Sequence, residues 1–150
     1  MAEDKLLLER LYSGILTAEP DPSSYTLVSR SLFHCDQEVR ERAIFIGGLR
    51  WADPLILSSF IGAITVGLES VDGNRRLMVE SLVSATLRGG GLDALSIASW
   101  LRTVIGLGDV NYLQAKAAYI GLLRIQGEIT TAEFATLDYD DVIIDSSIFS

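Results

Sequence analysis

Residues 36–50, Asp36-Gln-Glu-Val-Arg-Glu-Arg-Ala-Ile-Phe-Ile-Gly-Gly-Leu-Arg50, carry the pattern that decides the fold class of this chain. Apolar residues recur in this stretch at steps of three and four, which is the spacing of a helix with one buried side. The pattern returns twice: Val39, Ala43, Gly47, Leu49 and Arg50 match Leu77, Ser81, Ala85, Leu87 and Arg88, and then Leu113, Ala117, Gly121, Leu123 and Arg124. A repeat of this length predicts stacked helical units, whose small residues let neighbouring helices approach closely.

The rest of the chain also follows the helical period, and its breaks fall at capping or helix-breaking residues. Asp36 and Asp53 are typical of the position before a helix. Thr130 and Glu133 have the spacing of a capping box. The two prolines in residues 20–22 predict the end of the first helix. We expect helices over residues 4–16, 23–34, 36–50, 54–69, 73–88, 92–107, 109–125 and 131–137, and we find no alternating strand pattern, so the predicted class is all-α.

Asp36, Val39, Arg40 and Ala43 resemble the second-helix signature of the HEAT repeat family, which is an Asp followed by Val-Arg and then Ala. The later copies carry the signature less completely; in the second, Asn74 takes the place of the Asp. The resemblance implies a right-handed stack of about three antiparallel helical hairpins, a HEAT-like α-solenoid, with the second helices on the concave side. The hairpins would pair 23–34 with 36–50, 54–69 with 73–88, and 92–107 with 109–125. Armadillo and other helical solenoids share this repeat length and stay open as alternatives.

The chain is expected to fold as one domain over residues 1–150. Apolar residues make up 49% of the sequence and charged residues 21%, which is a globular balance. Residues 23–126 would hold the three hairpins. Because the end units of a stack must cover their outer faces, residues 1–17 are expected to form an N-terminal capping helix, and residues 127–150 a short helix and an acidic C-terminal segment.

A soluble protein of the reducing cytoplasm is the expected setting. The chain has one cysteine, Cys35, so it cannot form an internal disulfide. Its N-terminus is acidic where an export signal needs basic residues. The longest uncharged stretch, residues 54–68, is shorter than the roughly 20 residues of a membrane-spanning helix.

The net charge of −8 is concentrated at the C-terminal end. Residues 1–124 hold all twelve basic residues and fourteen acidic ones, whereas residues 125–150 hold six acidic residues and no basic one. This distribution argues against a chain that binds nucleic acid with its whole surface and favours a basic protein partner.

We expect no catalytic residue, no metal ion and no cofactor. His34, Cys35 and Asp36 are contiguous, but neighbours in a turn point in different directions, so we expect them to mark a helix boundary. Asp138, Asp140, Asp141 and Asp145 lack the glycine and the closing Glu of a calcium loop and are expected to form a solvated tail. Residues 89–91, three glycines, are a turn and not a phosphate loop, because no Lys-Ser/Thr follows them.

The proposed binding surface follows from the helical period. If Val39, Ala43 and Ile46 face the core, a rotation of 100° per residue places the side chains between them on the other side of the helix. The corresponding positions are Glu38, Glu41 and Phe45 in the first copy, Arg76, Val79 and Val83 in the second, and Tyr112, Ala115 and Tyr119 in the third. The residues predicted to bind a partner are Glu38, Glu41, Phe45, Arg76, Tyr112, Tyr119, Asp138, Asp140 and Asp141. The alternative is that the aromatic rings pack between helices or under the acidic segment.

The predicted function is non-enzymatic binding of another protein. In size and charge the chain resembles small acidic bacterial immunity proteins, which implies capture of a basic, nuclease-like toxin. Nucleic-acid binding is the alternative, either through Arg40, Arg75, Arg76 and Lys116, or through Arg50, Arg88 and Arg124 with Trp51 and Trp100 stacking on bases.

Overall fold

The computed structural model describes residues 2–13, 20–145 and 147, and every regular element within them is a helix. The all-α prediction is therefore confirmed for the described residues. The elements are α1 (Ala2–Tyr12), α2 (Pro22–Ser31), α3 (Gln37–Ile44), the π-helical segment η1 (Phe45–Arg50), α4 (Pro54–Val66), α5 (Asp72–Leu87), α6 (Ala94–Ile105), α7 (Leu113–Ile125), α8 (Thr131–Ala135) and the 3₁₀ turn η2 (Tyr139–Asp141).

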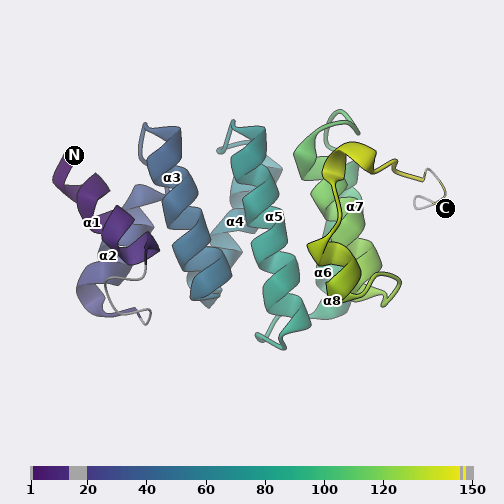
Figure 1. The fold of residues 1–150 in the computed structure, drawn as a ribbon, viewed down its shortest axis with the longest axis horizontal. Coiled ribbons are helices and arrows are strands. Elements are labelled where there is room, and N and C mark those ends of the chain that lie inside the picture. The colour runs from purple at the N-terminus through teal and green to yellow at the C-terminus, as the bar shows by residue number, and fades with distance from the viewer. Residues whose placement is uncertain (1, 14–19, 146, 148–150) are drawn as a thin grey trace.

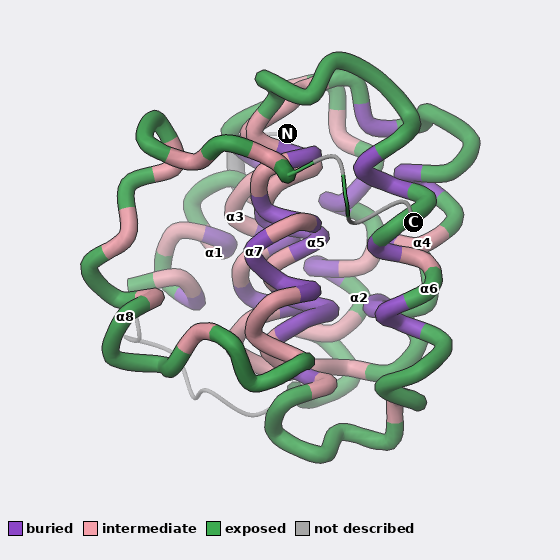
Figure 2. The backbone as a smooth tube through the Cα atoms, turned by 90° about the vertical axis from the view of Figure 1, so that its right-hand side faces the viewer, coloured by how far each residue is buried: buried purple, intermediate pink, exposed green. Residues whose placement is uncertain are grey.

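The helices lie in two layers (Figure 1). The helices α3, α5 and α7 stand side by side in a front layer, and α2, α4 and α6 lie behind them. The view along the long axis agrees, with α2, α4 and α6 on one side of the buried backbone (Figure 2). At the N-terminal end α1 contacts α2, α3 and η1, and at the other end the chain after α7 returns so that η2 contacts α7.

Several helix starts agree with the capping residues in the sequence. Asp36 accepts a backbone N–H bond from Glu38, and Asp53 accepts two, from Leu55 and Ile56. Thr130 and Glu133 form the capping box that their spacing predicts. These bonds occupy N–H groups that have no partner within the helix, which fixes where each helix begins.

Other helix boundaries differ from the predictions. Helix α2 begins at Pro22, one residue before its predicted start, because Asp21 and Ser24 form a capping box around it. Helix α4 stops at Val66, since Gly67 takes the left-handed conformation with φ of 79°. The first helix ends at Tyr12, and the predicted extension to residue 16 falls in residues 14–19, outside the described part of the chain.

The predicted helix 36–50 changes its winding at Phe45. The backbone N–H of Trp51 donates to the carbonyl of Ile46, which is the five-residue step of a π-helix. Close packing accompanies this segment: a Cβ atom on Gly48 would lie 2.6 Å from Phe60 Cε2 and 2.6 Å from Ser81 Oγ. Glycine at position 48 therefore lets η1 approach α4 and α5 more closely than any other residue would.

The repeated positions form much of the core. Val39 and Ala43 are buried as predicted. Gly121 shows why one of these positions needs a small residue, because a Cβ atom there would lie 2.5 Å from Val83 Cγ2. Val79 and Val83, which were expected to line the concave surface, are instead 0% and 1% exposed, and Ala115 is also buried. The expectation was wrong at these positions because α5 is enclosed by α3 and α7 beside it and by α4 and α6 behind it.

Arginines at two helix ends bond a neighbouring helix. Arg50 Nη1 donates to the Leu11 carbonyl, and Arg50 Nη2 donates to the Tyr12 carbonyl at 2.6 Å. At the equivalent position of the next unit, Arg88 Nη2 donates to the Leu49 carbonyl at 3.2 Å. Both guanidinium groups thus bond the last carbonyls of the preceding helix, where a positive charge is favourable.

The opposite ends of these helices are joined by Asp72 and Asn74. The carboxylate of Asp72 accepts the backbone N–H groups of Leu113 at 2.7 Å and Gln114 at 3.0 Å, at the start of α7. Asn74 Nδ2 donates to the Gln37 carbonyl at the start of α3 at 3.3 Å. The helices α3 and α5 are therefore bonded at both ends, and α5 and α7 at the start of α7.

Candidate functional site

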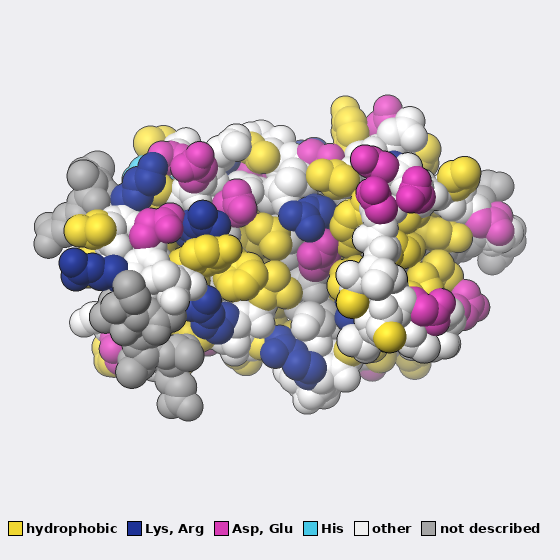
Figure 3. All heavy atoms as spheres, viewed as in Figure 1, with side chains coloured by type: hydrophobic (Ala, Val, Ile, Leu, Met, Phe, Trp, Pro, Cys, Tyr) yellow, Lys and Arg dark blue, Asp and Glu magenta, His cyan; other side chains and the backbone are white. Residues whose placement is uncertain are grey.

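The front face is the solvent-facing side of the front layer, partly covered at one end by α1 and at the other by the C-terminal strap, residues 126–145. Figure 3 shows apolar side chains in the middle of this face, with basic side chains beside them and acidic side chains both near the strap and towards α1 and α3. The predicted partner-binding residues all belong to the front-layer helices, to the turn before α7 or to the strap. The structure groups only some of them.

Phe45 lies in a cluster of two aromatic rings and two guanidinium groups, which we call the aromatic–arginine cluster: Tyr12, Arg42, Phe45 and Arg50. The rings of Tyr12 and Phe45 meet edge to face with centroids 5.1 Å apart. The guanidinium of Arg42 lies 3.9 Å from the Tyr12 centroid, and that of Arg50 lies 5.5 Å from the Phe45 centroid. Cation–π contacts hold the four side chains in one arrangement, and Arg42 keeps 32% of its side-chain surface exposed.

The C-terminal strap is held against the front layer by two aromatic residues. The guanidinium of Arg124 lies 3.9 Å from the Phe134 centroid. The hydroxyl of Tyr139 donates to Glu80 Oε1 at 2.8 Å, and Arg76 donates to the same oxygen at 3.0 Å. Burial and the charge of Glu80 both raise the pKa of Tyr139 above its ordinary value, so this hydroxyl stays a donor at neutral pH.

Three of the predicted residues meet at the edge of the strap. Arg76, Asp138 and Asp140 line a cavity of about 520 Å³ between α5, α7 and the strap. Asp138 itself caps η2 by accepting the backbone N–H of Asp140 at 2.9 Å. Asp138, Asp140 and Asp141 are all exposed, so the strap presents its negative charge to solvent beside Arg76.

The remaining predicted residues are spread over the front layer. Glu38 is the most exposed of them, with 71% of its side chain accessible, and Glu41 is half-buried. Tyr112 is 48% exposed in the turn before α7, whereas Tyr119 is half-buried against the core. Phe45 and Tyr119 thus pack partly between helices, as the alternative interpretation held.

Sequence reasoning missed Tyr12 and Arg42 as members of the front face. Arg42 and Phe45 are three residues apart on a helix, so their shared side was readable from the sequence. Tyr12 carries no such signal, because it reaches Phe45 only when α1 folds back over a position 33 residues away.

The basic residues considered for nucleic-acid binding are mostly neutralised. Arg40 pairs with Glu69 at 2.9 Å, and Arg76 pairs with Glu80 at 3.0 Å. Arg75 lies 3.9 Å from Asp72. A phosphate backbone would have to compete with these carboxylates for each guanidinium group.

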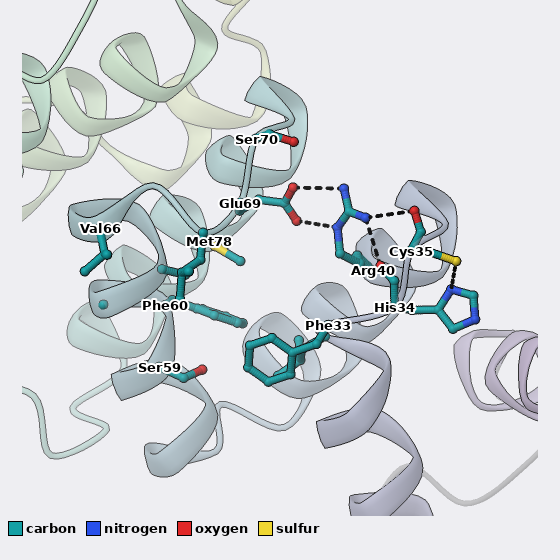
Figure 4. A pocket seen from close by; sticks show the side chains of 14 residues that line it. Phe33, His34, Cys35, Arg40, Ser59, Phe60, Val66, Glu69, Ser70 and Met78 are labelled. Atoms are coloured by element: carbon teal, nitrogen blue, oxygen red, sulfur yellow. Dashed lines mark hydrogen bonds and ion pairs between the residues drawn. The ribbon is translucent and has the colours of Figure 1, made fainter.

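A second hollow, the apolar pocket, opens between the α2–α3 turn and helix α4 (Figure 4). Its volume is about 500 Å³. Its walls include Phe33, Phe60, Gly62, Val66, Leu68 and Met78. In Figure 4 the side chains of Phe60 and Met78 lie between Val66 on one side and Phe33 on the other. No part of the sequence reasoning pointed to this pocket, because its walls come from three separate segments.

One wall of the apolar pocket is a buried ion pair. Arg40 donates to Glu69 through Nε at 2.9 Å and Nη2 at 3.1 Å, and its Nη1 bonds the carbonyls of His34 and Cys35. Glu69 also accepts the side chain of Asn74 and the backbone N–H of Val71. Burial alone would raise the pKa of Glu69, but these hydrogen bonds and the charge of Arg40 hold the pKa below its ordinary value. The pair is charged and fully bonded.

The turn beside this pair contains the three contiguous polar residues noted in the sequence. The backbone N–H of Asp36 donates to His34 Nδ1 at 3.0 Å, and Cys35 Sγ lies 3.9 Å from the same nitrogen. Asp36 caps α3, so the residue occupies a helix boundary. Cys35 is exposed, and its thiol is not part of a disulfide.

Two further findings concern the described residues as a whole. None of their helices combines the length and apolar character needed to cross a membrane. Within residues 2–13 and 20–145 we also find no group of three or more His, Cys, Asp or Glu side chains that could hold a metal ion.

The molecule thus offers two surfaces of different chemistry, the front face with its mixed charges and aromatic rings and the apolar pocket at the α2–α3 turn. Their interpretation rests on the contacts described above, because the chain matches no family model, no curated protein and no solved structure.

Proposed function

We propose that this protein is a non-enzymatic, HEAT-like helical-repeat module of the cytoplasm that binds another protein on its front face. The observation that carries the proposal is the aromatic–arginine cluster. Tyrosine and arginine are enriched among the residues that contribute most to protein–protein binding. Here two guanidinium groups and two rings, all half-buried, lie together at the surface and contact one another. A partner that covers them would lose little side-chain entropy in doing so.

The repeat supports the HEAT-like part of the proposal. Equivalent arginines, Arg50 and Arg88, make equivalent bonds to the helix before them, as expected if each unit stacks on its predecessor in the same way. Proteins built from such units commonly bind partners along the surface formed by successive second helices.

Charge supports a basic partner. The strap presents Asp138, Asp140 and Asp141 to solvent at one end of the front face, and Glu38 is exposed at the other. A basic protein that covers this face would meet the negative charge of the strap and of Glu38 as well as the rings of the aromatic–arginine cluster. A toxin domain that acts on nucleic acid has this chemistry, which is why an immunity-type role is the specific form we propose.

The test is co-purification of partners from the native cell, with quantitative comparison of variants. We expect the double variant Arg42→Ala, Phe45→Ala to lose the partner, because it removes a ring and a guanidinium group from the contact. Arg102→Ala is the matched control, since it removes a guanidinium group at an exposed position of the back-layer helix α6. Retention of the partner by the double variant, or equal loss in the control, would contradict the proposal.

The association rate with the purified partner gives a second test. Because the partner is proposed to be basic, its association rate should fall steeply as ionic strength rises. A rate that does not change between low and physiological salt would exclude the basic partner while leaving binding itself intact.

A further inference from the structure

We propose that the apolar pocket is a second binding site, and that it takes one large uncharged side chain, Leu, Met or Phe, presented by a partner protein. The pocket lies at the α2–α3 turn and is formed by residues other than those of the aromatic–arginine cluster. The inference therefore goes beyond the proposed function and can succeed or fail independently of it.

The bonding of the ion pair decides the charge of the occupant. Both carboxylate oxygens of Glu69 and all three nitrogens of the Arg40 guanidinium already have partners within the chain. A charged occupant would find no free counter-charge there and would lose its hydration without compensation. The rest of the wall is mainly apolar, including Phe60, Ala63 and Met78, so an uncharged apolar group fits best.

The rim of the pocket decides the size of the occupant. Phe33, Val66 and Leu68 are 72%, 73% and 69% exposed. All three line the opening. A small molecule inside the cavity would leave these side chains largely in water. A protein segment whose side chain enters the cavity would also cover the rim, and adjoining exposed apolar residues of this kind are typical of protein contacts.

Gly62 leaves room for an occupant to approach the backbone of α4. It lies within helix α4, where glycine is unfavourable relative to alanine. At Gly47, Gly48 and Gly121 a Cβ atom would collide with a neighbour, but a Cβ atom on Gly62 would meet no atom within 4 Å. The packing of this chain therefore does not require glycine at position 62, and the proposed occupant would use the space that its missing side chain leaves.

The first experiment uses capped amino acids as probes of the pocket, observed by NMR chemical-shift perturbation of the whole protein. N-acetyl-leucinamide and N-acetyl-phenylalaninamide should give saturable shifts at millimolar concentration, confined to residues 32–35 and 59–70. N-acetyl-lysinamide should give none. Equal shifts with the charged probe, or shifts spread over the whole protein, would overturn the proposal.

Variants of α4 locate the site. Gly62→Leu should abolish the saturable shifts by filling the pocket, while Ser58→Leu, a matched change at an exposed position of α4 that does not line the pocket, should leave them unchanged. Gly62→Ala should raise the Tm by about 2 to 4 °C, because the new methyl group meets open space. A fall in Tm with Gly62→Ala would show that the glycine serves internal packing and would overturn the argument from it.

A peptide separates a protein occupant from a small molecule. N-acetyl-Ala-Leu-Ala-amide should bind about tenfold more tightly than N-acetyl-leucinamide because its flanking residues contact the rim, and Val66→Ser should remove that gain. Equal affinity of the two probes, or tighter binding of decanoate than of the peptide, would overturn the protein occupant. A dimer in analytical ultracentrifugation that Gly62→Leu dissociates would assign the pocket to a second copy of this chain and would equally overturn it.

Discussion

Glu69 is 3% exposed and yet charged, so its contribution to stability depends on its bonds to Arg40, Asn74 and the Val71 backbone. We expect Glu69→Ala to lower the free energy of unfolding by about 3 to 5 kcal/mol, because it leaves the guanidinium of Arg40 largely buried without its counter-charge. Chemical denaturation followed by circular dichroism measures the change. Glu38→Ala, which removes an exposed carboxylate from the same end of the molecule, should change stability by less than about 0.5 kcal/mol.

Replacing both Arg40 and Glu69 separates the cost of leaving one charge buried without a partner from the stabilisation that the ion pair itself provides. Arg40→Leu combined with Glu69→Leu should be much less destabilising than Glu69→Ala alone, since no charge is left without a partner. A double variant as unstable as the single one would show that packing around these side chains, and not their charge, matters most.

Gly48 is a residue at which an added methyl group should destabilise the protein. Its Cβ would lie 2.6 Å from Phe60 Cε2 and from Ser81 Oγ, so α4 or α5 would have to move away from η1. We expect Gly48→Ala to lower the free energy of unfolding by about 1 to 3 kcal/mol, as measured by denaturant unfolding. Gly62→Ala provides the comparison: its added methyl group meets open space, so it should raise stability instead.

At the scale of helices and segments, the hydrogen bond from Tyr139 to Glu80 ties the C-terminal strap to α5. Tyr139→Phe removes a bond to a charged acceptor, and we expect the strap to open about tenfold more often, which corresponds to roughly 1.4 kcal/mol. Hydrogen exchange at the amides of Asp141 and Val142, which are bonded within the η2 turn, reports this opening. Tyr119→Phe is the matched control, and unchanged exchange in Tyr139→Phe would show that the Phe134 contact alone holds the strap.

The helices that begin at a side-chain cap could be predicted from the sequence, because capping is a local interaction. Asp36, Asp53 and Thr130 each bond a backbone N–H group two or three residues ahead, and each start was predicted within one residue. The start of α2 was also predicted within one residue, although Pro22 was assigned to the gap between helices, because a proline in the first turn and a proline that breaks a helix differ only in the capping residue before it. The π-helical winding at Phe45 follows from packing against other helices, which a local pattern does not contain.

The candidate site was less predictable than the fold, and the reason is distance along the chain. Phe45 was correctly placed on the front layer, but its neighbour Tyr12 comes from α1. The return of the strap brings Asp138 and Asp140 to Arg76, from more than 60 positions away. Val79 and Val83 were placed on the wrong side because a helix enclosed by four others has little exposed surface.

For the whole molecule, lowering the pH should reduce stability more than the loss of any single carboxylate does, because it protonates several carboxylates at once. The pKa of Glu69 lies below its ordinary value of 4.5, and those of Asp4, Asp21, Asp36 and Asp93 lie below their ordinary value of 3.8, chiefly because of hydrogen bonds to the charged form. The folded state therefore binds fewer protons than the unfolded state, so this stability is present above those ordinary values and is lost as pH falls through the lower, folded-state ones.

We accordingly expect the Tm to vary little from pH 7 to about pH 5 and then to fall progressively down to pH 3, as followed by thermal melts with circular dichroism. Glu69→Gln should reduce the steepness of that fall, since it removes one of the groups whose pKa is lowered. A Tm that rises on acidification would contradict the lowered pKa values, because it would require carboxyl groups that are easier to protonate in the folded state than in the unfolded state.

The bonds of Arg50 and Arg88 link α1 to η1 and η1 to the end of α5. A pulling force applied between the two ends of the chain would act on these contacts in series, and the weakest would yield first. The strap would detach before the helices separate, since two aromatic contacts hold it. Under tension the protein would lengthen in discrete steps. A partner bound at both ends would have to overcome the weakest of these contacts and not the free energy of unfolding of the whole protein.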